Sequence, residues 1–208
     1  DARVRYLCTP NNPTGTVTPL AVIAKLPGVV LLDEAYAAFS DDDHAAFAAG
    51  SSSLISVRTM SKAWGLAGLR VGYAIGPAQL VREIEKSRGP YKVSAVAEAA
   101  AVAAITNDGA WVADVVAQTR RNRARLMDEL TALGVGYLPS AANFVLIRLP
   151  AGCNATSMND ALRQRGVAAR PFSQLRGVGE CLRVTVGPWS MLEAFLAAFA
   201  GALEVQVS

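Results

Sequence analysis

The sequence predicts an α/β fold in which a mostly parallel, helix-covered sheet is followed by a smaller α+β unit. In the first hundred residues, short apolar runs alternate with helical segments, a pattern typical of strands buried on both faces. From about residue 94 the pattern changes to an alanine-rich helix, a long amphipathic helix and further short strands. Of the 208 residues, 52% are hydrophobic, which is enough for a sizeable core. We therefore expect two domains, at residues 1–100 and 101–208.

The first part of the chain contains four predicted strands. They are expected at residues 4–8, 29–32, 54–59 and 70–75. After the first strand and a stretch dense in turn-forming residues, Thr18 and Pro19 predict the start of a helix that ends near Gly28. Pro77 predicts the start of another helix, which runs to about Lys86.

The second part begins with two predicted helices, at residues 94–106 and 110–133. Trp111, Leu126 and Leu133 fall at helical spacing, and Gly134 ends the longer helix. The remaining strands are expected at 135–138, 143–149, 167–170 and 181–186, and the remaining helices at 154–165 and 188–203.

Composition excludes several classes of protein. The formal net charge is only +3, and no stretch concentrates basic residues with aromatic ones, so we expect no nucleic-acid partner. No run of about 18 apolar residues is uninterrupted, which argues against a membrane span. The chain has one histidine, His44, and three widely spaced cysteines, Cys8, Cys153 and Cys181. This set is typical of reduced thiols in a cytoplasmic protein, and we expect neither a disulfide framework nor a metal site.

Four polar segments lie at the ends of predicted strands. They are residues 11–15 (NNPTG), 33–36 (DEAY), 59–70 (TMSKAWGLAGLR) and 182–187 (LRVTVG). In open α/β sheets, ligands bind beyond the carboxyl ends of the strands. The sequence therefore predicts a ligand site built from these segments.

The four segments, in this order and spacing, resemble motifs of the fold-type I pyridoxal-phosphate-dependent aminotransferases of class I and II. The resemblance is closest to the histidinol-phosphate aminotransferase branch and covers essentially the whole sequence. It corresponds to the second half of the family's usual chain. The resemblance implies that residues 1–100 form the C-terminal part of the large pyridoxal-phosphate-binding domain and residues 101–208 the small α+β domain.

The resemblance assigns the two central catalytic roles to Lys62 and Asp33. Lys62 would form a Schiff base with the aldehyde of pyridoxal 5'-phosphate and move the proton at the substrate Cα. Asp33 would lie beside the pyridine nitrogen and keep it protonated. The alternatives are a surface lysine and an aspartate that only caps a helix.

Further cofactor contacts are implied by the same motifs. Tyr36 and Asn12 resemble the pair that hydrogen-bonds the phenolic oxygen of the cofactor. Arg70 resembles the arginine that binds the phosphate, and its planar guanidinium suits bidentate binding. Ser61 and Thr59 would donate hydroxyl hydrogen bonds to the same phosphate. The alternatives are an ordinary turn asparagine and polar loop ends.

Two arginines resemble substrate-binding residues of the family. Arg183 matches the arginine that binds the substrate α-carboxylate, the alternative being an edge-strand charge that faces water. Arg170 resembles a second arginine, which meets the side-chain phosphate of the substrate. Residues 89–94 (GPYKVS) depart from the family's usual Asn-Val-Asn pattern, and Lys92 and Ser94 therefore leave the substrate open.

The implied activity is that of a transaminase in amino-acid biosynthesis. It would transfer an amino group between an amino acid or amino alcohol phosphate and a 2-oxo acid, with histidinol phosphate as the first candidate. An aromatic amino acid aminotransferase and the threonine-phosphate decarboxylase of cobalamin biosynthesis share the same motifs. An alternative of another class is a non-catalytic remnant that acts by binding a partner chain.

The resemblance also implies macromolecular partners. The family forms homodimers, and its N-terminal half supplies the glycine-containing phosphate loop and the aromatic ring that stacks on the cofactor. Neither has a counterpart in this sequence, so we expect the missing N-terminal half of the same enzyme to be a partner. For the 208-residue chain alone, we expect weak cofactor binding and no measurable transamination.

Overall fold

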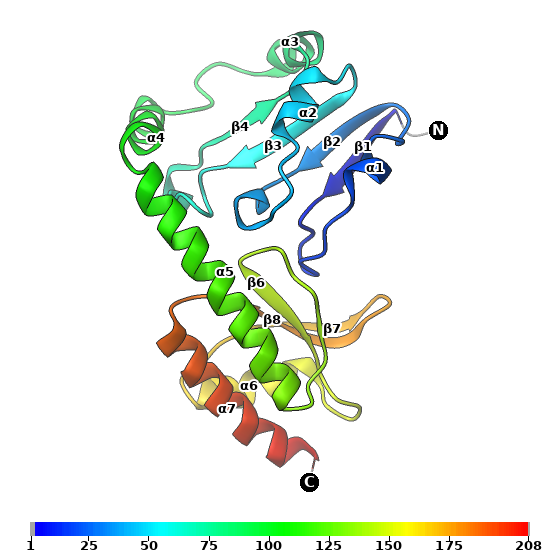
Figure 1. The fold of residues 1–208 in the computed structure, drawn as a ribbon, viewed down its shortest axis with the longest axis vertical. Coiled ribbons are helices and arrows are strands. Elements are labelled where there is room, and N and C mark those ends of the chain that lie inside the picture. The colour runs from blue at the N-terminus through cyan, green and yellow to red at the C-terminus, as the bar shows by residue number, and fades with distance from the viewer. Residues whose placement is uncertain (1–2, 208) are drawn as a thin grey trace. The chain divides into compact units, whose positions relative to one another are not determined.

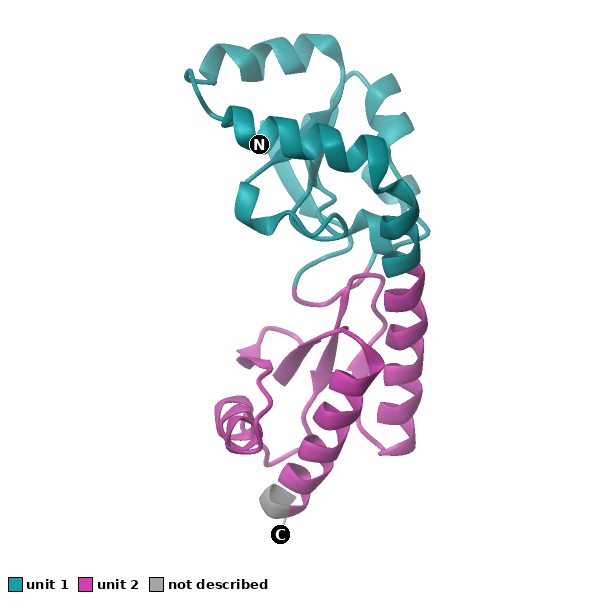
Figure 2. Ribbon diagram, turned by 90° about the vertical axis from the view of Figure 1, so that its left-hand side faces the viewer, with its two compact units in different colours: residues 1–12, 17–116 teal, residues 13–16, 117–208 magenta. Residues whose placement is uncertain are grey.

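The structure is a computed structural model that describes the backbone of residues 3–207 and the side chains of residues 3–204. The chain forms two compact units, residues 1–12 with 17–116 and residues 13–16 with 117–208 (Figure 2). The division falls inside helix α5, and the predicted domain boundary at residue 100 stays a prediction. Within the described residues, no helix combines the length and the apolar character that a membrane span needs.

Unit 1 is built on a four-stranded sheet (Figure 1). Its strands, in the spatial order β1-β2-β3-β4, are β1 (Val4–Cys8), β2 (Val29–Asp33), β3 (Leu54–Thr59) and β4 (Gly72–Ile75). The pairs β1–β2 and β2–β3 are parallel, whereas β4 is antiparallel to β3. The mostly parallel sheet predicted from the sequence is therefore confirmed.

Short helices connect and cover this sheet. They are α1 (Leu20–Ile23), α2 (Ala45–Gly50), α3 (Ala78–Ser87) and α4 (Ala95–Asn107), with single 3-10 turns at Ala37–Phe39 and Ala67–Leu69. The sequence analysis missed α2 and placed the start of α1 wrongly, because Pro19 and not Thr18 is its N-cap. The start of α4 is close to the prediction, and the Ser94 side chain accepts a hydrogen bond from the Ala97 amide.

Unit 2 combines an antiparallel sheet with three helices. Its elements are α5 (Gly109–Ala132), which begins in unit 1, β5 (Tyr137–Leu138), β6 (Phe144–Arg148), α6 (Ala155–Gln164), β7 (Arg170–Leu175), β8 (Gly179–Thr185) and α7 (Trp189–Val207). The strands follow the spatial order β5-β6-β8-β7. The strand predicted at 167–170 is wrong in position, because β7 begins only at Arg170 and continues through Pro171 to Leu175. Proline is tolerated there since β7 lies at the edge of the sheet.

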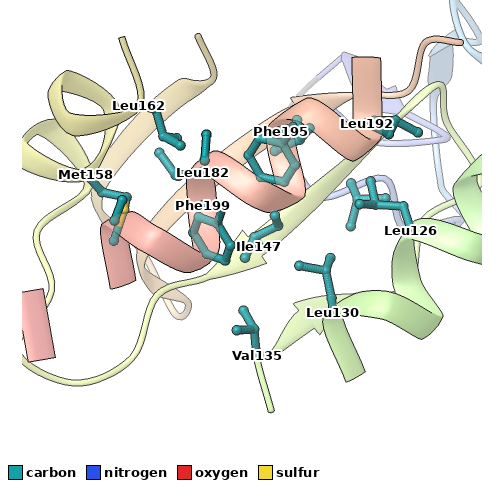
Figure 3. Close-up of a cluster of buried hydrophobic side chains, with 14 of the residues drawn as sticks. Leu126, Leu130, Val135, Ile147, Met158, Leu162, Leu182, Leu192, Phe195 and Phe199 are labelled. Carbon is teal, nitrogen blue, oxygen red and sulfur yellow. The ribbon is translucent and has the colours of Figure 1, made fainter. Parts of the chain in front are cut away.

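The core of unit 2 lies between its sheet and its helices (Figure 3). Leu130 of α5, Ile147 of β6 and Leu182 of β8 are fully buried in one cluster with residues of α6 and α7. On α7, the rings of Phe195 and Phe199 stack with centroids 5.4 Å apart. Burial of aromatic and aliphatic side chains is the main stabilising contribution to such a unit. The core therefore gives β8 a firm support on one face.

Within unit 2, residues 13–16 pack closely against the loop that contains Ser140. Gly15 has a left-handed backbone with φ of +75°, and an added Cβ would lie 2.6 Å from the Cβ of Ser140. The Gly15 carbonyl accepts a hydrogen bond of 2.8 Å from the Ala141 amide. Only glycine meets both the conformational and the steric requirement at this position.

Gly15→Ala is expected to destabilise unit 2 by about 3 kcal/mol, because it combines left-handed strain with overpacking against Ser140. The control is Gly177→Ala: Gly177 has the same φ of +75°, but nothing lies within 4 Å of its added Cβ. This control is expected to lose only about 1 kcal/mol. Urea unfolding of both variants measures the difference, and equal losses would contradict the close packing.

Candidate functional site

A pocket in unit 1 gathers most of the predicted cofactor residues. It has a volume of about 300 Å³ and lies where β2 and β3 end. Its lining consists of Asp33, Ala35, Val57, Arg58, Thr59, Ser61, Lys62 and Arg70. The structure thus brings together the predicted amine, carboxylate, guanidinium and two hydroxyls.

Asp33 is the last residue of β2, and both of its carboxylate oxygens accept hydrogen bonds. The Ala35 amide donates to Oδ1 at 3.0 Å, and the Tyr6 hydroxyl donates to Oδ2. This hydrogen bond, together with burial and the negative charge of Asp33, raises the pKa of Tyr6 above its usual range. Asp33 does not cap the nearby 3-10 turn, whose N-cap residue is Tyr36.

Lys62 and Tyr36 are in direct contact. The Nζ atom of Lys62 lies 5.4 Å from the centroid of the Tyr36 ring, within cation–π distance. Tyr36 is buried, with 7% of its surface exposed, whereas the Lys62 side chain is exposed. The carbonyl of Lys62 accepts a hydrogen bond of 3.1 Å from the Gly65 amide. The Lys62 amine is therefore accessible at the surface, while the backbone of the residue is held by a turn hydrogen bond.

The loop that carries Lys62 is held from both ends. The Met60 amide donates to the Val71 carbonyl at 3.1 Å, and the Met60 carbonyl accepts from the Leu66 amide at 2.9 Å. Met60 itself is buried in a small cluster with Ala101 and Ala104 of α4. This anchoring leaves the polar side chains of the loop free to face the pocket.

Arg70 has a strained backbone at the end of this loop. Its φ of +55° lies in the left-handed region, which costs a residue other than glycine about 1–2 kcal/mol. The guanidinium donates a hydrogen bond of 3.1 Å to the Ala67 carbonyl. Strain of this kind is concentrated at functional sites, where the surrounding structure maintains it.

The remaining predicted cofactor residues differ in how well they are placed. Thr59 and Ser61 form a turn in which the Ser61 amide donates to Thr59 Oγ1 at 3.0 Å. Asn12 is exposed and does not line the pocket. Its backbone amide donates to the thiol of Cys8, whose pKa is raised chiefly by burial. The role of Asn12 stays a prediction.

Unit 2 contains a second pocket, of about 570 Å³, lined by both predicted substrate arginines. Arg170 on β7 and Arg183 on β8 are direct partners in the antiparallel register. The guanidinium carbon of Arg183 lies 4.9 Å from the Phe144 ring centroid, and that of Arg170 lies 5.7 Å from the Phe172 centroid. Arg183 stands on an interior strand, so it is not an edge-strand charge. A pocket lined by two arginine side chains favours the binding of an anion.

Sequence analysis missed a buried ionic network beside the unit 1 pocket. Glu34, which is 2% exposed, accepts hydrogen bonds from His44 Nδ1 at 2.8 Å, from an Arg58 nitrogen at 3.0 Å and from the Ser56 hydroxyl. Arg58 also pairs with Asp43 at 2.7 Å. The sequence signal for this network is the charged Glu34, which comes directly after an apolar strand. His44, for which the sequence predicted no role, is a structural partner of Glu34.

Charge in this network is stabilised by pairing. Burial disfavours the charged form of Arg58, but the hydrogen bond to Asp43 and the nearby charge of Glu34 raise its pKa above the usual range. The same Arg58 hydrogen bond lowers the pKa of Asp43. Arg58 therefore stays charged and connects the end of β3 to the segment before α2.

The chain belongs to the class I and II aminotransferase family, whose model matches residues 2–199. This finding confirms the family and the fold class that the four segments predicted. In the sheet of unit 1, the loop after the third strand bears Lys62, which lines the pocket described above.

Within the family, the chain is similar to histidinol-phosphate aminotransferases. It is 40% identical over 215 residues to histidinol-phosphate aminotransferase 1 of Cupriavidus pinatubonensis, covering 98% of this chain and 57% of that protein. The crystal structure of the Sinorhizobium meliloti histidinol-phosphate aminotransferase in complex with pyridoxal-5'-phosphate matches with a TM-score of 0.85 at 27% identity. This match covers 98% of this chain and 58% of that one.

A solved structure with a different activity is similar as well. The L-threonine-O-3-phosphate decarboxylase of Porphyromonas gingivalis matches with a TM-score of 0.83 at 28% identity, over 97% of this chain and 64% of that one. The chain spans little more than half the length of the curated relatives that it matches, such as the Cupriavidus pinatubonensis protein.

Glu34→Gln is expected to destabilise unit 1 by about 3 kcal/mol, because it removes the buried negative charge that pairs with Arg58. The matched control is Glu83→Gln, which breaks an exposed pair with Lys86 and is expected to change stability by less than about 1 kcal/mol. Urea unfolding of the two variants provides the test. A loss for Glu34→Gln no larger than for the control would show that the network contributes little.

Proposed function

We propose that this chain supplies the pyridoxal 5'-phosphate site and the substrate arginines of a transaminase. The observation that carries the proposal is the unit 1 pocket, which is lined by a lysine, a carboxylate, two hydroxyls and two arginines. This donor set fits the cofactor, because guanidinium and hydroxyl groups suit a phosphate, a carboxylate suits a protonated ring nitrogen, and an amine suits an aldehyde. When bound, the cofactor would accept the electron pair released at the substrate Cα.

The proposed roles follow from the chemistry of each side chain. Lys62 holds the cofactor through its amine and moves the proton at the substrate Cα, acting as general base and acid. Asp33 keeps the ring nitrogen protonated, and its two hydrogen bonds support a fixed carboxylate. Tyr36, which contacts Lys62, and Asn12 donate to the phenolic oxygen.

The phosphate of the cofactor is assigned to Arg70, Ser61 and Thr59. Arg70 supplies charge and bidentate geometry, and the two hydroxyls complete the hydrogen bonds. The left-handed backbone of Arg70 supports this role, because it sets the direction in which the side chain leaves the loop.

The proposed substrates are an amino alcohol phosphate or amino acid and a 2-oxo acid, with histidinol phosphate first. The paired arginines support an anionic substrate, since Arg183 suits a carboxylate and Arg170 suits a phosphate. The names of the most similar relatives support histidinol phosphate. The decarboxylase neighbour keeps a threonine-phosphate decarboxylase as the second candidate, and an aromatic aminotransferase shares the same residues.

The whole protein is proposed to act as a cytoplasmic homodimer that includes the N-terminal half of the fold. The length of the relatives supports an N-terminal half as partner. This chain covers 57% of the Cupriavidus pinatubonensis protein described above. A non-catalytic remnant that binds a partner chain is the competing hypothesis. Cofactor absorbance of the purified protein decides between the two.

Lys62→Ala is expected to abolish the absorbance band of the bound cofactor and to lower transamination by roughly a thousandfold or more. Amino-donor turnover and visible absorbance are both measured on the complex of this chain with the N-terminal half. Lys86→Ala is the control, because Lys86 is an exposed lysine paired with Glu83 on α3. Turnover of Lys62→Ala within tenfold of the unchanged protein would refute the assignment.

Arg183→Ala is expected to raise the KM for the anionic substrate roughly 100-fold, while the Kd for the cofactor changes less than about twofold. The control is Arg176→Ala, an exposed arginine in the turn of the same β7–β8 hairpin that does not line the pocket. Steady-state kinetics and cofactor titration measure the two constants. Equal losses in substrate and cofactor binding would count against a substrate role for Arg183.

A further inference from the structure

Tyr6 lies on the same face of the unit 1 sheet as Asp33. In the parallel pairing of β1 with β2, Cys8 is opposite Asp33 and Tyr6 is opposite Leu31. Residues two apart on a strand point to the same face, so Tyr6 is a diagonal neighbour of Asp33, within reach of a long aromatic side chain. The four polar segments identified in the sequence do not include Tyr6.

The hydroxyl of Tyr6 is directed at the carboxylate of Asp33. It donates to Oδ2, while the Ala35 amide donates to Oδ1 at 3.0 Å. A carboxylate held at both oxygens has little freedom to rotate, and each oxygen keeps a second lone pair for another donor. The hydrogen bond is strong enough to raise the pKa of Tyr6 above its usual range.

Because Tyr6 is exposed, its side chain contributes little to the packing of the core. The side chain is 63% exposed and is not part of the buried core of unit 1. Removing its hydroxyl therefore has little to disturb in the fold of the described residues. A phenylalanine would keep the ring contact but would lose the only atom of the side chain that can donate a hydrogen bond.

We propose that Tyr6 is a positioning residue for the cofactor, acting through Asp33. Its hydroxyl fixes the orientation in which the Asp33 carboxylate receives the ring N–H of the cofactor. This inference rests on the proposed function of Asp33. Tyr6, in the middle of β1, would then affect cofactor affinity through Asp33, although Tyr6 precedes the NNPTG turn and does not line the pocket.

A double-mutant cycle with Tyr6→Phe and Asp33→Asn tests the proposal. The Kd for pyridoxal 5'-phosphate is measured by absorbance in this chain and in its complex with the N-terminal half. Tyr6→Phe is expected to raise the Kd roughly tenfold, because the Asp33 carboxylate is no longer held in one orientation before the cofactor binds. In the Asp33→Asn background, Tyr6→Phe is expected to change the Kd less than about twofold, because the group it acts through is already altered.

Tyr73→Phe is the matched control, since Tyr73 is a half-exposed tyrosine on β4 of the same sheet. It is expected to leave the Kd unchanged, and urea unfolding is expected to show equal stability for both phenylalanine variants. The proposal is overturned if Tyr6→Phe leaves the Kd unchanged, if it tightens binding, or if its effect is the same in the Asp33→Asn background.

A second measurement needs no cofactor and separates this inference from the proposed function. Ultraviolet titration of the cofactor-free chain is expected to show one tyrosine whose pKa is raised above its usual range. Asp33→Asn is expected to lower the pKa of this tyrosine, and Tyr6→Phe to remove its titration. If neither Asp33→Asn nor Tyr6→Phe alters this titration, the hydrogen bond itself is refuted. If the cofactor absorbance band does not depend on Lys62, only the proposed function is refuted.

Discussion

Parallel pairing of β2 with β3 is the constraint on which the candidate site depends. The strands run in the same direction with Asp33 beside Val57, so the chain leaves both strands at the same edge of the sheet. The segments that begin at Asp33 and Thr59 therefore meet, although they are far apart in the sequence. A slip of one residue in β2 would turn Asp33 to the opposite face of the sheet, away from the pocket that Lys62 lines.

Two successive acidic residues at this edge serve opposite faces of the sheet. Asp33 faces the pocket and keeps lone pairs available for a ligand. Glu34 is buried and holds His44 and Arg58, which ties β3 to the segment before α2. Because both are carboxylates, only burial and hydrogen-bond partners distinguish Asp33, the proposed cofactor residue, from Glu34, a structural residue. The network also explains how a charged arginine is accommodated at the end of an apolar strand.

The two arginines proposed to bind substrate depend on a different kind of pairing. Arg170 and Arg183 are brought opposite each other by the antiparallel register of β7 and β8. Like charges in this position repel, and contact with the faces of Phe172 and Phe144 offsets part of that repulsion. An anion bound between the arginines would remove the remainder. The apolar core of unit 2 holds the strands in the geometry that makes this possible.

The sequence by itself determined the alternation of strands and helices, the start of α4 near Ser94 and the lysine-bearing loop, because these follow from local patterns and motif order. Only the tertiary structure decided that β4 is antiparallel, that β7 continues through Pro171, and that Glu34 meets His44. It alone placed Tyr6 on Asp33. The physical reason is that a strand's register, edge position and cross-strand partners depend on residues distant in the chain, which no local pattern specifies.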